Sequence, residues 1–419
     1  MSGSRRRCVL AFSGGLDTSV AVRWLSDELG FQVVTLTADL GGEGREPETL
    51  IERALRAGAV AAHVVDARRV FVDQFAFPTL AAGALYEGVY PLATALARPL
   101  IARLLVDVAR EEGATAVAHG CTGKGNDQVR FDVATAALAP ELEVVAPVRD
   151  WAMGRPQEIA YAAAHGIDVP ATVESPYSVD ENLWGRSVEC GPLEDPWTAP
   201  PEAVYEWTAD PATADARGEE VAIGFERGIP VSLDGERLTG EALVSRLNAI
   251  AGRNGAGRID HVENRLVGIK SREVYEAPAA LVLHAAHGAL ETVAVPGDVA
   301  RVKRQLAGEW ARLVYDGLWF GALRSALAAF VSATQEHVTG EVRVRCARGA
   351  VSVTGRRAER SLYSSPLATY DRDADSFDHS AARGFIELFG LPLRTQARVQ
   401  GAFDRLPPLA LPRQVRRGG

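Results

Sequence analysis

The stretch that decides the fold lies near the N-terminus and reads Ala11-Phe12-Ser13-Gly14-Gly15-Leu16-Asp17-Thr18-Ser19. An apolar run at 8–12 leads into it and a helical pattern over 18–29 follows, which predicts a strand-to-helix turn. Two glycines let backbone N–H groups approach an anion, the hydroxyl groups add donors, and the helix dipole favours negative charge at this end. The sequence therefore predicts a phosphate-binding loop.

The loop differs from the commoner nucleotide-binding motifs, because GxxxxGK[ST] and GxGxxG are both absent. Gly123-Lys124 imitates part of the first motif, but Gly125 follows where Ser or Thr is required. The Ser-Gly-Gly-x-Asp-x-Ser string resembles the PP-loop of ATP pyrophosphatases, which adenylate a substrate oxygen and release pyrophosphate. A Gly-rich turn with hydroxyl groups that only cap the helix is the alternative, and it explains single residues better than the whole string.

The surrounding pattern alternates short strands with helices. Strands are expected at 8–12, 32–37, 62–65, 115–118 and 143–145, and helices at 18–29, 48–57, 99–111 and 128–137. This βαβα rhythm predicts an α/β fold in which a doubly wound parallel sheet is covered on both faces. From residue 221 the pattern is α+β, with strands at 221–226 and 229–233, helices at 241–251 and 299–317, a hairpin over 341–354 and a last helix over 376–389.

Composition excludes several classes of protein. With 419 residues, 47% hydrophobic and 24% charged, the chain is long enough for two folded units and is not disordered. A net charge of −9 argues against nucleic acid as a partner. Four cysteines without a CxxC pair argue against disulfides and zinc and favour a reducing cytoplasm. Apolar runs are too short for a membrane span, and we expect no targeting segment.

A second cluster follows the strand expected at 115–118, at the edge where open α/β sheets bind ligands. It reads His119-Gly120-Cys121-Thr122-Gly123-Lys124-Gly125-Asn126-Asp127-Gln128-Val129-Arg130. Arg130 is suited to pair with the carboxylate of a small zwitterion and Asp127 with its ammonium group. The alternative is a solvated polar loop in which Asn126 or Asp127 caps a helix.

Together these motifs resemble the argininosuccinate synthases. Further matching strings begin at Tyr90-Pro91, Ser175-Pro176 and Gly257-Arg258, and continue over 268–272 and 275–276. Trp184-Gly185-Arg186 and the string over 376–385 are similar to the actinobacterial branch. The resemblance implies a PP-loop nucleotide-binding domain over 1–168, an α+β synthetase and multimerisation domain over 169–370, a C-terminal helical oligomerisation arm over 371–405 and a flexible tail over 406–419.

The resemblance also implies the binding sites. ATP would lie against Ala11, Phe12, Ser13, Gly14, Gly15, Leu16, Asp17, Thr18, Ser19, Ala38 and Gly120. L-Citrulline would lie against Tyr90, Thr94, Ala95, Asn126, Arg130, Ser178, Ser187, Glu263 and Tyr275. L-Aspartate would lie against Thr122, Asn126 and Asp127. The catalytic group would be Ser13, Asp17, Asn126, Asp127 and Arg130, and Mg²⁺ would arrive with ATP and not on a protein metal site.

The implied reaction has two steps. The ureido oxygen of citrulline attacks the α-phosphorus of ATP to give a citrullyl-adenylate and pyrophosphate, and the aspartate amine then displaces AMP to form argininosuccinate. The resemblance further implies a homotetramer that acts in arginine biosynthesis, and the composition predicts a cytoplasmic protein with neither nucleic acid nor a membrane as partner. No general base is identified from the sequence.

Three departures from the usual family pattern keep alternatives open. Phe12 replaces a common Tyr, the loop over 39–46 lacks a frequent Gln, and Ala95 stands where many members have Ser. A ligase recruited to another ureido or carboxyl substrate is one alternative. A PP-loop enzyme that modifies tRNA and a nucleotide-binding protein without catalysis are the others, and the net charge argues against the former.

Three side chains of reactive types can each be interpreted in two ways. His119 is either an acid, base or metal ligand or, as we favour, a structural hydrogen-bonding group. Cys121 is interpreted as a small buried residue and not as a nucleophile. Lys270 either approaches a phosphate or pairs with an acid.

Overall fold

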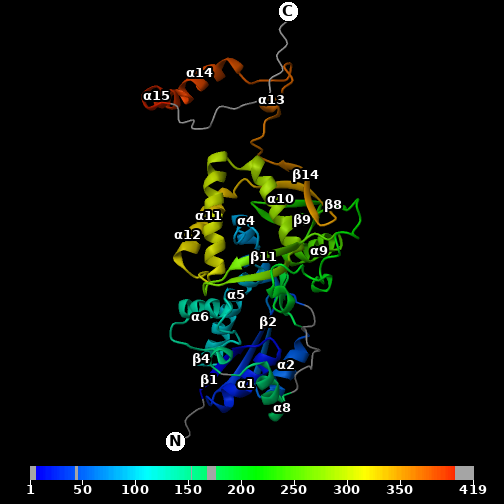
Figure 1. The fold of residues 1–419 in the computed structure, drawn as a ribbon, viewed down its shortest axis with the longest axis vertical. Helices are drawn as coiled ribbons and strands as arrows, with labels where there is room; N and C mark the ends of the chain where they lie inside the picture. Colours follow the sequence, from blue (N-terminus) through cyan, green and yellow to red (C-terminus); the bar gives the residue numbers. More distant parts are fainter. Residues whose placement is uncertain (1–5, 43–45, 152, 168–175, 402–419) are drawn as a thin grey trace, which may run out of the picture. The chain divides into compact units, whose positions relative to one another are not determined.

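The computed structural model describes residues 6–42, 46–151, 153–167 and 176–401, in two compact units that meet in the sequence at Leu362 and Tyr363. Figure 1 colours them from blue to red along the chain. The predicted boundary at 168/169, the predicted tail at 406–419 and part of the loop over 39–46 lie outside the described residues.

The first unit begins with a five-stranded parallel sheet in the order β3-β2-β1-β4-β5. Its strands are β1 (Arg7–Ala11), β2 (Gln32–Asp39), β3 (Ala61–Asp66), β4 (Ala116–Ala118) and β5 (Glu143–Val145). The main helices around it are α1 (Leu16–Asp27), α2 (Pro47–Arg56), α5 (Ala93–Glu111), α6 (Asp127–Leu138) and α8 (Arg155–Ala164). The predicted doubly wound sheet is confirmed.

Side chains of β1 alternate between two apolar layers, as a strand buried on both faces requires. Cys8 and Leu10 pack with α1 and α8, whereas Val9 packs with α5 and α6. The strand order reverses between β1 and β4, so the loops that follow these two strands flank the crevice at the carboxyl edge of the sheet. The phosphate-binding loop and the second cluster are those two loops.

The remainder of this unit contains two antiparallel sheets. One has the order β11-β12-β7-β6 and the other β10-β9-β8-β13-β14. Their strands are β6 (Ser178–Asn182), β7 (Gly185–Glu189), β8 (Glu219–Glu226), β9 (Ile229–Leu233), β10 (Glu236–Arg237), β11 (Arg258–Asn264), β12 (Lys270–Glu276), β13 (Gly340–Ala347) and β14 (Ala350–Ala358). Helices α9 (Gly240–Arg253), α10 (Pro278–Ala294), α11 (Gly297–Tyr315) and α12 (Ala322–Thr334) accompany them (Figure 1). This confirms the predicted α+β part.

The short elements and the second unit complete the fold. The short ones are α3 (Arg68–Phe71), η1 (Val72–Ala76), α4 (Phe77–Ala82), α7 (Pro147–Asp150), η2 (Gly191–Glu194) and η3 (Glu202–Val204). The second unit contains α13 (Ser365–Ala368), α14 (His379–Phe389) and α15 (Leu391–Gln400), none of which has a buried residue. No helix among the described residues has the length and apolar character needed to cross a membrane.

Two sequence predictions need correction. The helix expected at 99–111 begins six residues earlier, at Ala93, and Pro99 lies inside it and not at its start. Proline is common in the first turn, which made Pro99 a misleading start signal. Strands β6, β7, β11 and β12 were not predicted, because their charged sequences lack a regular apolar alternation.

Candidate active site

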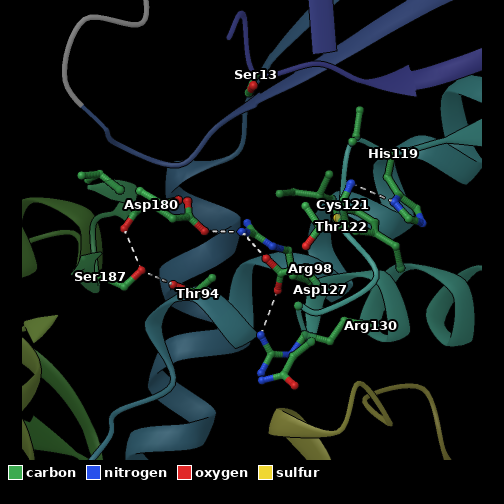
Figure 2. A pocket seen from close by; sticks show the side chains of 18 of the residues that line it. Ser13, Thr94, Arg98, His119, Cys121, Thr122, Asp127, Arg130, Asp180 and Ser187 are labelled. Carbon is green, nitrogen blue, oxygen red and sulfur yellow. Dashed lines mark hydrogen bonds and ion pairs between the residues drawn. The ribbon is translucent and has the colours of Figure 1, made fainter. Parts of the chain in front are cut away.

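A pocket of about 490 Å³ opens at the carboxyl edge of the parallel sheet. The loops after β1 and β4 and the first turns of α5 and α6 line one part of it. Most of the rest is lined by the end of β2, strands β6, β7, β11 and β12, and the end of α11. Figure 2 shows Ser13 on one side and the Arg98, Asp127 and Arg130 cluster on the other. The pocket thus joins the two sequence motifs, although they lie about a hundred residues apart.

The phosphate-binding loop is held by hydrogen bonds at both ends. Phe12 N–H donates to Leu36 O at 2.8 Å, which extends the β1–β2 pairing to the loop. At the other end Ser19 N–H donates to Gly15 O at 3.1 Å, the first helical bond of α1. Gly14 has φ of +80°, a left-handed conformation that glycine adopts without strain. The loop can therefore turn sharply and present backbone N–H groups at the start of α1.

A chain of four alternating charges crosses the pocket from β6 to α6. Arg98 Nη2 donates to Asp127 Oδ2 at 2.8 Å and also to Asp180 Oδ2. Arg130 Nη1 donates to Asp127 Oδ1 at 2.9 Å (Figure 2). Burial would raise the pKa of Asp127, but the two guanidinium groups outweigh it and lower the pKa to about 2. Asp127 is therefore a fixed, ionised acceptor.

Glu263 provides a second carboxylate, 3% exposed, on β11. Tyr275 OH donates to Oε2 at 2.7 Å and Tyr315 OH donates to Oε1 at 2.5 Å. Asn126 Nδ2 donates to Tyr315 OH at 2.7 Å, which links β11 to the loop before α6. Tyr90 stacks on Tyr275 with ring centroids 4.1 Å apart. Both oxygens of Glu263 are thus oriented by phenol groups.

Comparison with known proteins agrees with this geometry. Residues 7–168 match the family model described as the arginosuccinate synthase N-terminal HUP domain, and residues 177–396 match the arginosuccinate synthase C-terminal domain. The chain belongs to the argininosuccinate synthase family.

Named relatives cover nearly the whole chain. An argininosuccinate synthase of Symbiobacterium thermophilum is 56% identical over 95% of this chain and 99% of its own length. One from Rubrobacter xylanophilus is 57% identical over 94% of this chain and 96% of its own length. One from Oceanobacillus iheyensis is 53% identical over 95% of both chains.

The residues that the argininosuccinate synthase resemblance assigns to ATP divide into two groups. Those that line the pocket are Ala11, Phe12, Ser13, Asp17, Thr18, Ala38 and Gly120. Gly14, Gly15 and Leu16 form the loop without lining the cavity, and Ser19 is fully buried within α1. Ser13 Oγ and Thr18 Oγ1 lie 3.1 Å apart, so the two hydroxyl groups stand together at the base of the loop.

The residues assigned to the two amino acids nearly all line the same pocket. For citrulline these are Tyr90, Thr94, Asn126, Arg130, Ser178, Ser187, Glu263 and Tyr275, and for aspartate Thr122, Asn126 and Asp127. Ala95 is fully buried and does not line the cavity. Thr94 precedes it, and its Oγ1 lies 3.3 Å from Ser187 Oγ. Ala95 itself is therefore not part of the pocket wall, and Thr94 is.

The three ambiguous side chains have structural partners. His119 Nδ1 accepts from Cys121 N–H at 3.3 Å, so its Nε2–H donates to Asp132 at 2.7 Å. Burial raises the pKa of the Cys121 thiol well above its usual value, which disfavours the thiolate. Lys270 Nζ donates to Asn264 Oδ1 at 2.8 Å and does not line the pocket.

Several residues that line the pocket were not identified from the sequence. They are Arg98, Asp180, Glu189, Arg265, Glu273 and Tyr315. Arg265 donates to Glu189 and to Glu273, and burial together with the Glu189 and Glu263 charges raises the pKa of Glu273 to about 9. Arg98 and Asp180 lie in strings that mark the family, but no spacing rule singled them out. The described residues hold no cluster of three or more His, Cys, Asp or Glu that could hold a metal ion.

Proposed function

We propose that this chain catalyses the ATP-dependent ligation of citrulline and aspartate to argininosuccinate, with AMP and pyrophosphate as the other products. The observation that carries the proposal is that a PP-loop and two separately oriented carboxylates, Asp127 and Glu263, line one pocket in a member of this family. Two zwitterions each require an acceptor for their ammonium group, and the pocket supplies one for each.

ATP lies with its phosphates at the PP-loop. The N-terminus of α1 and the Ser13 and Thr18 hydroxyl groups offer donors for the β- and γ-phosphates, where charge develops as pyrophosphate leaves. Asp17 is a single lining carboxylate at this end, which suits a Mg²⁺ ion held mainly by phosphate oxygens and water. When bound, that ion would neutralise part of the phosphate charge.

Citrulline lies between the nucleotide-binding loops and the antiparallel sheet. Glu263, held by Tyr275 and Tyr315, accepts from its ammonium group. Ser178 and Ser187 line the pocket on β6 and β7, and Arg130 faces the carboxylate of citrulline. Held by both charged groups on its α-carbon, citrulline presents its ureido oxygen to the α-phosphorus, and positioning of this kind contributes up to about 7–11 kcal/mol in well-oriented reactions.

Aspartate lies at the N-terminus of α6. Asp127 accepts from its ammonium group before the amine is deprotonated, and Thr122 and Asn126 hold its carboxylates. The free amine then attacks the ureido carbon of the adenylate, a C–N bond forms, and the C–O bond to AMP breaks. His119 serves this site indirectly, because its hydrogen bonds hold the loop through Cys121 and Asp132.

The assembly and its setting extend the proposal. We propose a cytoplasmic homotetramer whose contacts include the arm over 371–405, because α14 and α15 expose Phe385, Leu388, Phe389 and Leu391. Nucleic acid and membranes are not among the proposed partners, in line with the net charge of −9.

The test is product formation from three substrates. The purified protein is incubated with MgATP, citrulline and aspartate, pyrophosphate release is followed, and argininosuccinate is detected by mass. Omission of any one substrate should abolish the product. Pyrophosphate release that neither amino acid stimulates, or ATP binding without turnover, would reject these substrates in favour of another ligase reaction or a non-catalytic role.

A further inference from the structure

Helix α2 packs against the PP-loop at Gly14, a residue that does not line the pocket. Arg53 Nη1 donates to Gly14 O at 2.7 Å. A Cβ atom at Gly14 would stand only 2.8 Å from Leu50 Cδ2 and 3.2 Å from Arg53 Nη1. Arg53 is half-buried there, although the pocket wall does not include it. The guanidinium group of Arg53 thus contacts the PP-loop outside the wall of the pocket.

The hydrogen bond from Arg53 to Gly14 O also fixes the direction of the Gly15 N–H group. Gly14 C=O and Gly15 N–H belong to one planar trans peptide and point in opposite directions. Gly15 N–H donates to Ser13 Oγ at 3.3 Å, and Ser13 lines the pocket. Because Arg53 holds the carbonyl oxygen on the side of α2, it keeps the Gly15 N–H directed at Ser13 Oγ.

This peptide needs such an anchor. Gly14 lacks a Cβ atom and has φ of +80°, so side-chain sterics do not restrict rotation of the peptide that follows it. The first carbonyl that accepts a helical hydrogen bond is that of Gly15, so the carbonyl of Gly14 lies just outside the helical pattern. A cation on the carbonyl also polarises the peptide, which strengthens its N–H as a donor.

We propose that Arg53 is a positioning residue for adenylation: it fixes and polarises the Gly14–Gly15 peptide, whose N–H holds Ser13 Oγ so that the Ser13 hydroxyl group faces the departing pyrophosphate. The inference rests on the proposed function, because it assumes that the PP-loop binds the ATP phosphates. Within the described residues Arg53 makes no ion pair with a carboxylate. Its charge is therefore directed at the loop, unlike that of Arg56, which pairs with Glu52 at 2.9 Å on the exposed face of the same helix.

The experiment compares Arg53→Met, Arg53→Lys and the matched control Arg56→Met. Citrulline-dependent exchange of labelled pyrophosphate into ATP, without aspartate, isolates the first step. Arg53→Met should lower the exchange rate about tenfold or more, since loss of one oriented donor to a developing charge has at least this effect. Arg53→Lys should recover much of the rate, because it keeps a cationic donor. Arg56→Met should exchange as the unaltered protein does.

The KM for aspartate separates positioning from a general structural defect. It should change by no more than about twofold in Arg53→Met, because the proposed aspartate residues, Thr122, Asn126 and Asp127, follow β4 and not β1. An exchange rate in Arg53→Met equal to that of the unaltered protein would overturn the inference. An equal loss at the ATP and aspartate sites with a lowered Tm would also overturn it. Absence of exchange in the unaltered protein would instead reject the proposed function.

Discussion

Arg98 and Asp127 form an ion pair of 2.8 Å that joins α5 to the first residue of α6, and the same guanidinium nitrogen reaches Asp180 on β6. The parallel-sheet part and the antiparallel part of the pocket therefore share one half-buried cation. Because Arg130 holds the other oxygen of Asp127, neither oxygen of this carboxylate can rotate freely. The proposed ammonium acceptor for aspartate is thereby fixed in position before the substrate arrives.

Replacement of Arg98 should weaken aspartate binding selectively. A hydrogen bond to a charged group contributes about 1.5–3 kcal/mol, so Arg98→Met should raise the KM for aspartate about ten- to a hundredfold. The KM values for ATP and citrulline should change far less. Arg103→Met is the matched control, because Arg103 lies on the same helix and pairs with Asp107 at the surface. An equal rise in all three KM values would contradict the role of Arg98.

The Glu263 carboxylate should govern citrulline binding. Glu263→Gln keeps an oxygen acceptor for one tyrosine but removes the negative charge, so the KM for citrulline should rise at least about tenfold. Tyr315→Phe removes one of the two phenol donors to Glu263 and should give a smaller rise. Steady-state pyrophosphate release at saturating ATP and aspartate measures both. An unchanged KM for citrulline in Glu263→Gln would place its ammonium group elsewhere.

Gly14 should tolerate no side chain. Gly14→Ala combines a left-handed φ of +80° with a Cβ atom 2.8 Å from Leu50, so ATP binding should be lost or much weakened. Gly30→Ala tests the backbone strain alone, because Gly30 has φ of +69° and nothing within 4 Å of its Cβ position. Isothermal titration with ATP should show near-normal affinity in Gly30→Ala. Equal affinity in both variants would rule out a steric role for Gly14.

Ionisation of Glu158 should make the free energy of unfolding depend on pH. Burial and the neighbouring Asp17 carboxylate raise its pKa from 4.5 to about 7. Between these values the folded state holds more protons at this site than the unfolded state, so ionisation lowers stability as the pH rises. Glu158→Gln, which cannot ionise, should melt at a higher temperature than the unaltered protein above pH 7 and at a similar temperature near pH 4.5. A difference in Tm that is constant with pH would refute this.

The apolar face of the C-terminal arm should control assembly. Phe385 and Phe389 are 64% and 75% exposed and stack with centroids 5.3 Å apart. Replacing both with Ser should shift the proposed tetramer to smaller species in light scattering. Arg383→Ala, on an exposed side chain of the same helix, is the control. A tetramer that survives the double replacement would remove these residues from the interface.

Much of the nucleotide-binding part followed from the sequence. The apolar β1 strand, the glycines of the PP-loop and the loop from His119 to Arg130 carry local signals, and the parallel direction of the strands brings the two loops to the same sheet edge. The hairpin expected over 341–354 was also predicted correctly, since β13 alternates buried and exposed residues, and the structure turns the chain at Arg348-Gly349.

The antiparallel wall of the pocket could not be predicted in the same way. Strands such as β11 carry charged residues on both faces because one face contributes to the pocket, so apolar periodicity is lost. Arg98 was missed because Pro99 was interpreted as the helix start, which left Arg98 in a loop and not in the second turn of α5. Tyr315 lies at the end of α11, and only the tertiary fold brings it to Glu263.

The most direct test of the proposed citrullyl-adenylate follows the ureido oxygen of citrulline. Citrulline labelled with ¹⁸O in its ureido group is converted with ATP and aspartate, and the AMP is analysed by mass spectrometry. If the ureido oxygen attacks the α-phosphorus, the new P–O bond survives when the amine displaces AMP from carbon, so AMP should carry the label. Unlabelled AMP formed together with argininosuccinate would contradict the citrullyl-adenylate and the role assigned here to the PP-loop.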